Sequence, residues 1–191
     1  MRMSLARPTA TETTQVTREM LIEKLNEDLA REYQAIIAYV TYSQVLKGAE
    51  YMAIAAELEV HAGEELQHAL TIAKQIDYLG GTPATTALPV KQTDDAREML
   101  RADLENENAT IRGYRERIVQ CEALQEYAIA EDIREILRQE QEHQIDLATA
   151  LGEDVPDRQC GDRPLALTVE KPSALGEREV VLESIRRRQR A

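Results

Sequence analysis

The sequence contains the same short motif twice: a glutamate followed three residues later by a histidine. The first copy is Glu65 with His68, and the second is Glu140 with His143. Residues three apart on an α-helix lie on the same face, so each pair can hold one metal ion between a carboxylate and an imidazole. The repeated motif therefore predicts metal binding.

Each copy of the motif belongs to a longer repeat. A further glutamate, Glu32 or Glu107, precedes each motif glutamate by 33 residues, and shifting the first half of the chain forward by 75 residues superposes the two sets. The matches at this one offset indicate a duplicated unit with room for two ions. The four aligned pairs are Glu32 with Glu107, Tyr39 with Tyr114, Glu65 with Glu140, and His68 with His143.

These glutamates fall where apolar residues are expected. Leu25, Leu29 and Ile36 surround Glu32 at steps of four and three, the pattern of a helix packed in a bundle, and the other three glutamates occupy equivalent positions in their own helices. Ionised carboxylates in a core cost many kcal/mol when unpaired, and four together repel one another. A positive species must sit among them.

The ligand chemistry narrows the choice of metal. Two imidazoles and four carboxylates suit two divalent iron ions, with manganese as the alternative. Such a mixed set disfavours ions that prefer thiolates, and zinc more often takes fewer carboxylates. We therefore expect two iron ions per subunit.

Composition and charge predict a soluble all-α protein. The 191 residues include no Phe and no Trp and are rich in strong helix formers. The net charge is −12, and residues 1–151 carry the whole excess, with 27 acidic and 15 basic groups. This balance argues against nucleic acid as a partner and suits the attraction of cations. With no signal peptide, no membrane span and no disulfide framework, we expect a cytoplasmic location.

Three segments are expected along the chain. Residues 1–16 are polar and predict a flexible arm, residues 17–151 predict a four-helix bundle, and residues 152–191 form a C-terminal tail with three prolines. The first helix should begin after Thr17, and the break at Lys47-Gly48 should make the first two helices antiparallel. The turn between the third and fourth helices has no Gly or Pro, so only the 75-residue correspondence places it, near 122–126.

The connection between the second and third helices is long enough to define the topology. About 14 residues, beginning with Gly80-Gly81-Thr82-Pro83, separate the two helices. In extended form they reach roughly 46 to 50 Å, which is just the length of a 30-residue helix of about 45 Å. The connection can therefore cross the whole bundle and set these two helices parallel, as in antiparallel four-helix bundles with one long crossover.

Over about residues 20 to 150 the chain resembles the bacterioferritins of the ferritin-like superfamily. The stretches that carry the resemblance are Leu25-Asn26-x-x-Leu29-x-x-Glu32-x6-Tyr39, Glu65-Leu66-Gln67-His68-Ala69, Gly81-Thr82-Pro83, Asp103-Leu104-x-x-Glu107 and Ile136-Leu137-Arg138-x-Glu140-x-x-His143. The resemblance implies a ferroxidase that oxidises Fe(II) with dioxygen or hydrogen peroxide and stores ferric mineral in a hollow shell of many identical subunits. It also implies a di-iron site in which Glu65 and Glu140 bridge the two irons. The six ligands of that site would be Glu32, Glu65, His68, Glu107, Glu140 and His143.

One residue departs from the family pattern. Bacterioferritins bind haem between two subunits through a methionine directly after the glutamate of the second helix, and this chain has Leu66 there. Leucine cannot ligate iron, so we expect no haem. Met52 lies far along the same helix and is expected in the core.

Several other residues allow two interpretations. Tyr39 and Tyr114 are either packed core residues or functional ones, as hydrogen-bond partners of ligands or electron donors during oxygen chemistry, and the resemblance also marks Tyr39. His61 and Glu64 are expected to be exposed polar residues, with a site of iron uptake or an inner-surface site as the functional alternative. Cys121 is expected to be buried, and the role of Cys160 is open.

The sequence also allows other functions. A rubrerythrin-like peroxidase or oxygenase normally adds a glutamate three residues after the third-helix ligand, where this chain has Thr110, and a Cys-x-x-Cys domain that it lacks. DNA-binding mini-ferritins place their metal site between subunits, whereas the duplicated ligands of this chain favour a site inside one subunit. The end of the tail, Leu182-Glu183-Ser184-Ile185-Arg186-Arg187, faintly resembles peptides that dock ferritin-like cargo in encapsulin shells.

Overall fold

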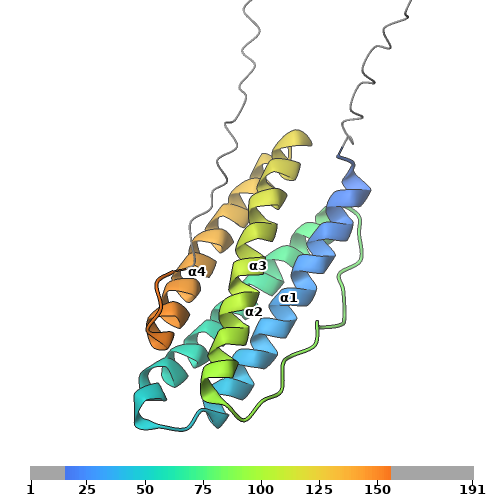
Figure 1. Cartoon of the computed structure of the whole chain (residues 1–191). Coiled ribbons are helices and arrows are strands. Elements are labelled where there is room, and N and C mark those ends of the chain that lie inside the picture. The colour runs from blue at the N-terminus through green and yellow to red at the C-terminus, as the bar shows by residue number, and fades with distance from the viewer. Residues whose placement is uncertain (1–15, 156–191) are drawn as a thin grey trace, which may run out of the picture. The chain divides into compact units, whose positions relative to one another are not determined.

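The computed structural model describes residues 16–155, which form a bundle of four long helices (Figure 1). The predicted arm (1–16) and tail (152–191) lie almost wholly outside these residues. None of the described helices is long and apolar enough to cross a membrane. The helices are α1 (Arg18–Val45), α2 (Met52–Tyr78), α3 (Ala96–Ala123) and α4 (Tyr127–Leu151), and the short 3-10 helix η1 (Ala49–Tyr51) precedes α2.

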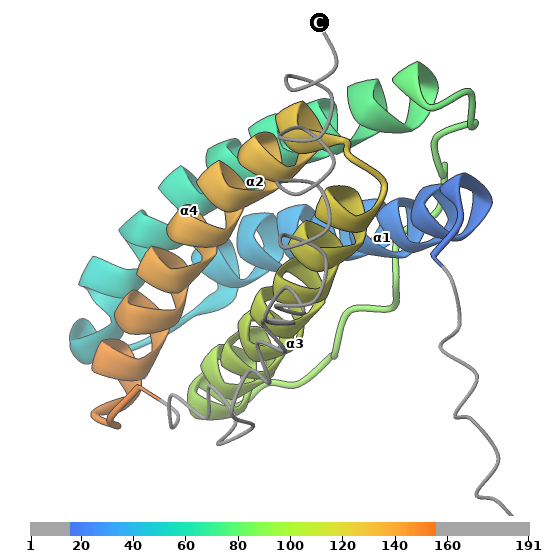
Figure 2. The same ribbon diagram turned by 90° about the horizontal axis from the view of Figure 1, so that it is seen from above.

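The predicted topology is confirmed. The helices α1 and α2 form one antiparallel hairpin, α3 and α4 form the other, and the two hairpins pack against each other (Figures 1 and 2). The crossover from α2 to α3 runs the length of the bundle, so these two helices are parallel. The crossover lies along α1, where the Leu88 amide donates to the Ala30 carbonyl at 3.0 Å and the Tyr42 hydroxyl donates to the Lys91 carbonyl.

Local sequence signals account for the helix ends. The side chains of Thr17 and Asp95 accept hydrogen bonds from the Met20 and Glu98 amides, and so cap α1 and α3. The break after α1 is at Gly48, whose φ of 128° suits glycine. The turn between α3 and α4 lies at the predicted position, although a non-glycine residue, Gln125, adopts the positive φ of 63° there.

Two apolar clusters fill the bundle on either side of a polar layer. One contains Leu25 and Leu29 of α1 with Ile72 of α2, and the other contains Leu58 of α2 with Leu100 of α3. The predicted metal ligands occupy the layer between the two clusters. Among the other expectations, Cys121 is buried as predicted, but Met52 is 73% exposed and the expectation that it packs in the core is wrong; it is the first residue of α2, at the end of the bundle.

A buried ion pair joins α1 to α3 close to the ligand layer. The Arg117 Nε donates to the Asp28 carboxylate at 2.7 Å, and both side chains are at most 5% exposed. Burial raises the pKa of Asp28 even though Arg117 lies beside it. The pair therefore gives little net stability, but the loss of one partner leaves an unpaired charge in the core.

We predict that Asp28→Ala lowers the free energy of unfolding by about 3 kcal/mol or more, because Arg117 is left buried without its carboxylate. The neighbouring Glu27→Ala is the matched control, since it removes only an exposed pair with Lys24 and should cost less than about 1 kcal/mol. Denaturant unfolding followed by circular dichroism at fixed protein concentration measures both. Equal losses in the two variants would contradict the structural role of Asp28.

Candidate metal centre

The structure brings all six predicted ligands together in the polar layer. Each of the four helices supplies one glutamate, and α2 and α4 each add a histidine one turn later. All six residues are at most 2% exposed. By helix they are Glu32 from α1, Glu65 and His68 from α2, Glu107 from α3, and Glu140 and His143 from α4.

The six side chains form two overlapping groups. In one group Glu32 and His68 face Glu65 and Glu140, and in the other Glu107 and His143 face the same two glutamates. Within each group, one donor atom per residue lies within 4.8 Å of every other. Each group matches the size of a coordination shell, and the shared pair stands between the two.

Both histidines turn Nδ1 toward the carboxylates. The Nδ1 of His68 lies 3.1 Å from Glu65 and 3.1 Å from Glu140, while the Nδ1 of His143 lies 3.0 Å from Glu65 and 3.4 Å from Glu140. The same nitrogen of each ring is thus available as a ligand atom in each group.

The other ring nitrogen of each histidine is held by the residue before a ligand glutamate. The Nε2 of His143 lies 2.9 Å from Glu64, and the Nε2 of His68 lies 3.0 Å from Gln139. These contacts fix the ring orientations, as second partners of metal-binding histidines commonly do. Sequence reasoning missed Gln139. Its separation of 75 residues from Glu64, the offset of the repeat, was the signal that would have found it.

The two repeat tyrosines contact the ligands crosswise. The Tyr39 hydroxyl on α1 donates to Glu107 on α3, and the Tyr114 hydroxyl on α3 donates to Glu32 on α1. Burial, reinforced by these carboxylates, raises the pKa of both tyrosines well above its usual value. Both therefore remain protonated donors at neutral pH.

Without a metal, protons must balance the buried charge. Burial, together with Glu65 and Glu140, raises the pKa of Glu32 and Glu107. Burial alone would raise the pKa of Glu65 too, but the two neighbouring imidazoles outweigh it and lower that pKa. Burial would likewise lower the pKa of His143, but the carboxylates of Glu140 and Glu65 outweigh it and raise the pKa to about 10.

The donor set fits bound cations because many of its atoms have no hydrogen-bond partner. Within the described residues, these buried atoms include an oxygen of Glu32, Glu65 and Glu107, both oxygens of Glu140, and Nδ1 of His143. Several of them lie within ion-pair distance of one another but do not form a hydrogen bond. Buried polar atoms in folded proteins are normally satisfied, so this concentration in one place calls for a ligand. Hard oxygen donors with imidazole suit divalent iron or manganese.

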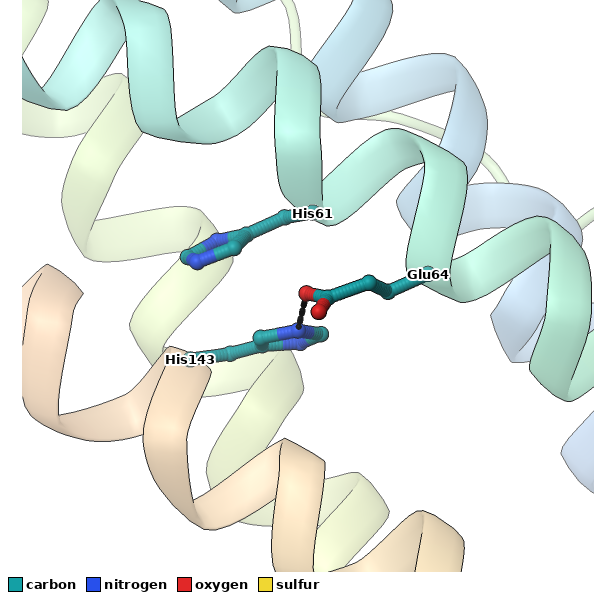
Figure 3. Close-up of side chains that lie close together, drawn as sticks. All are labelled: His61, Glu64 and His143. Atoms are coloured by element: carbon teal, nitrogen blue, oxygen red, sulfur yellow. Dashed lines mark hydrogen bonds and ion pairs between the residues drawn. The ribbon is translucent and has the colours of Figure 1, made fainter.

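Two further buried groups lie beside the six. His61, expected to be exposed, is only 2% exposed, so that interpretation is wrong; its ring stacks on His143 with centroids 4.1 Å apart (Figure 3). Glu64 is partly exposed, with 35% of its side chain accessible. Asp103 on α3 is also buried, with one oxygen unpartnered, and burial raises its pKa. Sequence reasoning used Asp103 only as part of a motif.

Comparison with known proteins agrees with this architecture. The family model for the ferritin-like domain matches residues 22–154. A bacterioferritin of Desulfovibrio desulfuricans is 29% identical over 157 residues, covering 82% of this chain and 86% of that protein. A bacterioferritin of Mycobacterium bovis is 30% identical over 153 residues, covering 75% of this chain and 95% of that protein. The protein is a member of the ferritin-like family, and its curated relatives are bacterioferritins.

Solved structures give the same result. A ferritin-like di-iron carboxylate protein from Bacillus anthracis superposes with a TM-score of 0.68 at 36% identity, covering 70% of this chain and 96% of that one. A dodecameric thioferritin from Bacteroides fragilis, described as bacterioferritin-related, superposes with a TM-score of 0.67 at 27% identity, covering 72% and 88%.

Proposed function

We propose that this protein is a ferroxidase whose buried centre binds two Fe(II) ions and oxidises them. The observation that carries the proposal is the pair of overlapping donor groups with unpartnered buried oxygens. Each Fe(II) loses one electron, and the two electrons reduce dioxygen to hydrogen peroxide with two protons, or hydrogen peroxide to water. Manganese in place of iron is the alternative occupant.

The roles of the residues in this proposal follow from their positions. One ion would be held by Glu32 and His68 and the other by Glu107 and His143, with Glu65 and Glu140 available to both. Tyr39 and Tyr114 orient Glu107 and Glu32 through their hydroxyls. Glu64 and Gln139 keep Nδ1 of each histidine directed at the ions.

We predict that Glu32→Ala slows Fe(II) oxidation by at least about 100-fold, since loss of a ligand should exceed the 10- to 100-fold cost of losing a supporting partner. Stopped-flow absorbance of ferric iron measures the rate, and circular dichroism checks the fold. Glu23→Ala, on the same helix and outside the centre, is the control. Wild-type oxidation rates in Glu32→Ala would refute the assignment.

We also predict that binding of Co(II) to the metal-free protein releases protons at pH 7. His143, with a pKa of about 10, carries a proton there and must lose it to bind a metal. Metal affinity should rise with pH up to about 10, by about tenfold per unit for each proton displaced. A pH indicator in weak buffer measures the release, and His143→Ala should release fewer protons. No release would contradict protonated histidines.

We further propose that the oxidised iron is stored in an assembly of identical subunits. The bacterioferritin relatives support iron storage in general, and the dodecameric neighbour supports self-association. A cytoplasmic location and the absence of haem belong to the same proposal. Leu66, at the position of the haem methionine, is 47% exposed and offers no ligand atom. A non-storing di-iron peroxidase or oxygenase, and cargo of an encapsulin shell, are the alternatives.

Aerobic loading separates these functions. Metal-free protein is given excess Fe(II), and iron per chain and particle mass are measured on a sizing column. Storage predicts many more irons per chain than the centre can hold, in a large particle. Retention of only about two per chain in a small oligomer would instead favour a non-storing enzyme or an encapsulated ferroxidase.

A further inference from the structure

A second group of side chains that could ligate a metal lies next to the centre, where His61 stacks on His143. A groove of about 370 Å³ runs between α2 and α4, and its walls include Glu57 and Asp146. Both carboxylates are close to half exposed, at 49% and 44%. Behind them lies His61, whose side chain is only 3% exposed. The three residues are thus a buried imidazole behind two accessible carboxylates.

The distance from His61 to Asp146 fits two ligands of a shared ion, and Glu57 lies slightly farther away. The Nε2 of His61 lies 3.4 Å from Asp146 and 3.8 Å from Glu57. Two ligands about 2.1 Å from one metal ion lie roughly 3.0 to 3.4 Å apart for ordinary coordination angles. One donor atom from each of the three residues lies within 4.8 Å of the others. A small rotation of the exposed Glu57 side chain would complete the set.

The ion pairs of His61 involve only one of its two ring nitrogens, Nε2. Within the described residues, Nδ1 of His61 has no hydrogen-bond partner although the ring is buried. The groove contains a third carboxylate, Glu50, and no lysine or arginine among the described residues that line it. The groove therefore places excess negative charge next to a buried imidazole, the setting in which a cation is favoured.

A second cavity that reaches the centre has a cationic side chain in its lining, beside the ligand glutamates. This narrow cavity between α1 and α3 reaches Glu32 and Glu107, and Arg31 stands in its lining. The Nε of Arg31 is buried without a hydrogen-bond partner among the described residues. A guanidinium repels an approaching Fe(II), whereas the carboxylates of the α2–α4 groove attract it.

We infer that Glu57, His61 and Asp146 form a third metal site, which takes a divalent first-row transition-metal ion from the groove and passes it toward the centre. The passage follows the contact of His61 with His143, whose rings stack at 28°, and Glu64 lies beside both rings (Figure 3). The site itself stands on its own geometry. Its part in delivering Fe(II) rests on the proposed ferroxidase function.

Cobalt is the probe for the site. Crystals of wild-type protein soaked in Co(II) should show anomalous density beside Nε2 of His61, and the double variant Glu57→Gln, Asp146→Asn should lose it. Both substituted side chains are substantially exposed, so the fold should persist. Glu142→Gln, at an exposed position of α4, is the matched control and should keep the density. No cobalt beside His61 in the wild type, or unchanged density in the double variant, would overturn the site.

The delivery of Fe(II) from this site to the centre is tested separately, by oxidation kinetics. At Fe(II) concentrations below saturation the double variant should oxidise iron at least about tenfold more slowly than wild type, with little change at saturation, because the site raises the local metal concentration. Equal rates at low Fe(II) would overturn delivery. Cobalt beside His61 combined with no Fe(II) oxidation by wild type would refute the proposed function while leaving this site intact.

Discussion

Four carboxylates and two imidazoles are buried in one layer of the bundle, and the fold is stable only if their charges are balanced. Four buried negative charges without compensation would destabilise any small domain, because each would lose its hydration and repel the others. Protonated histidines and neutral glutamates can balance the charge in the metal-free protein, and two divalent ions would balance it in the proposed centre. The apolar clusters on either side of the layer hold the helices in place while this exchange occurs.

The duplicated sequence produces a centre that neither half could build alone. Each half supplies supporting groups to the other: the tyrosines of one hairpin hold the glutamates of the other, and the residues preceding the motif glutamates hold the opposite histidines. This reciprocity requires corresponding helices to run at matching heights, which the crossover along α1 makes possible. The crossed contacts are Tyr39 to Glu107, Tyr114 to Glu32, Glu64 to His143 and Gln139 to His68.

Most of the architecture could be predicted from the sequence, since helix spacing, caps and one repeat offset are local signals. The turn at Gln125 was placed only through the repeat, because a non-glycine residue adopts the positive φ. The solvent exposure of individual polar side chains was harder to predict. His61 falls beside the ligand face of α2, and its burial depends on α4 packing over it, with Asp146 contributed from far along the chain. The third-site group therefore became visible only in three dimensions.

The central claim is that the six buried side chains hold two iron ions. The most direct measurement is iron anomalous scattering from crystals soaked anaerobically in Fe(II). The account predicts two peaks in the polar layer, both within about 2.0 to 2.3 Å of oxygens from Glu65 and Glu140, with one next to His68 and the other next to His143. Absence of iron between these two glutamates, with the helices intact, would contradict it.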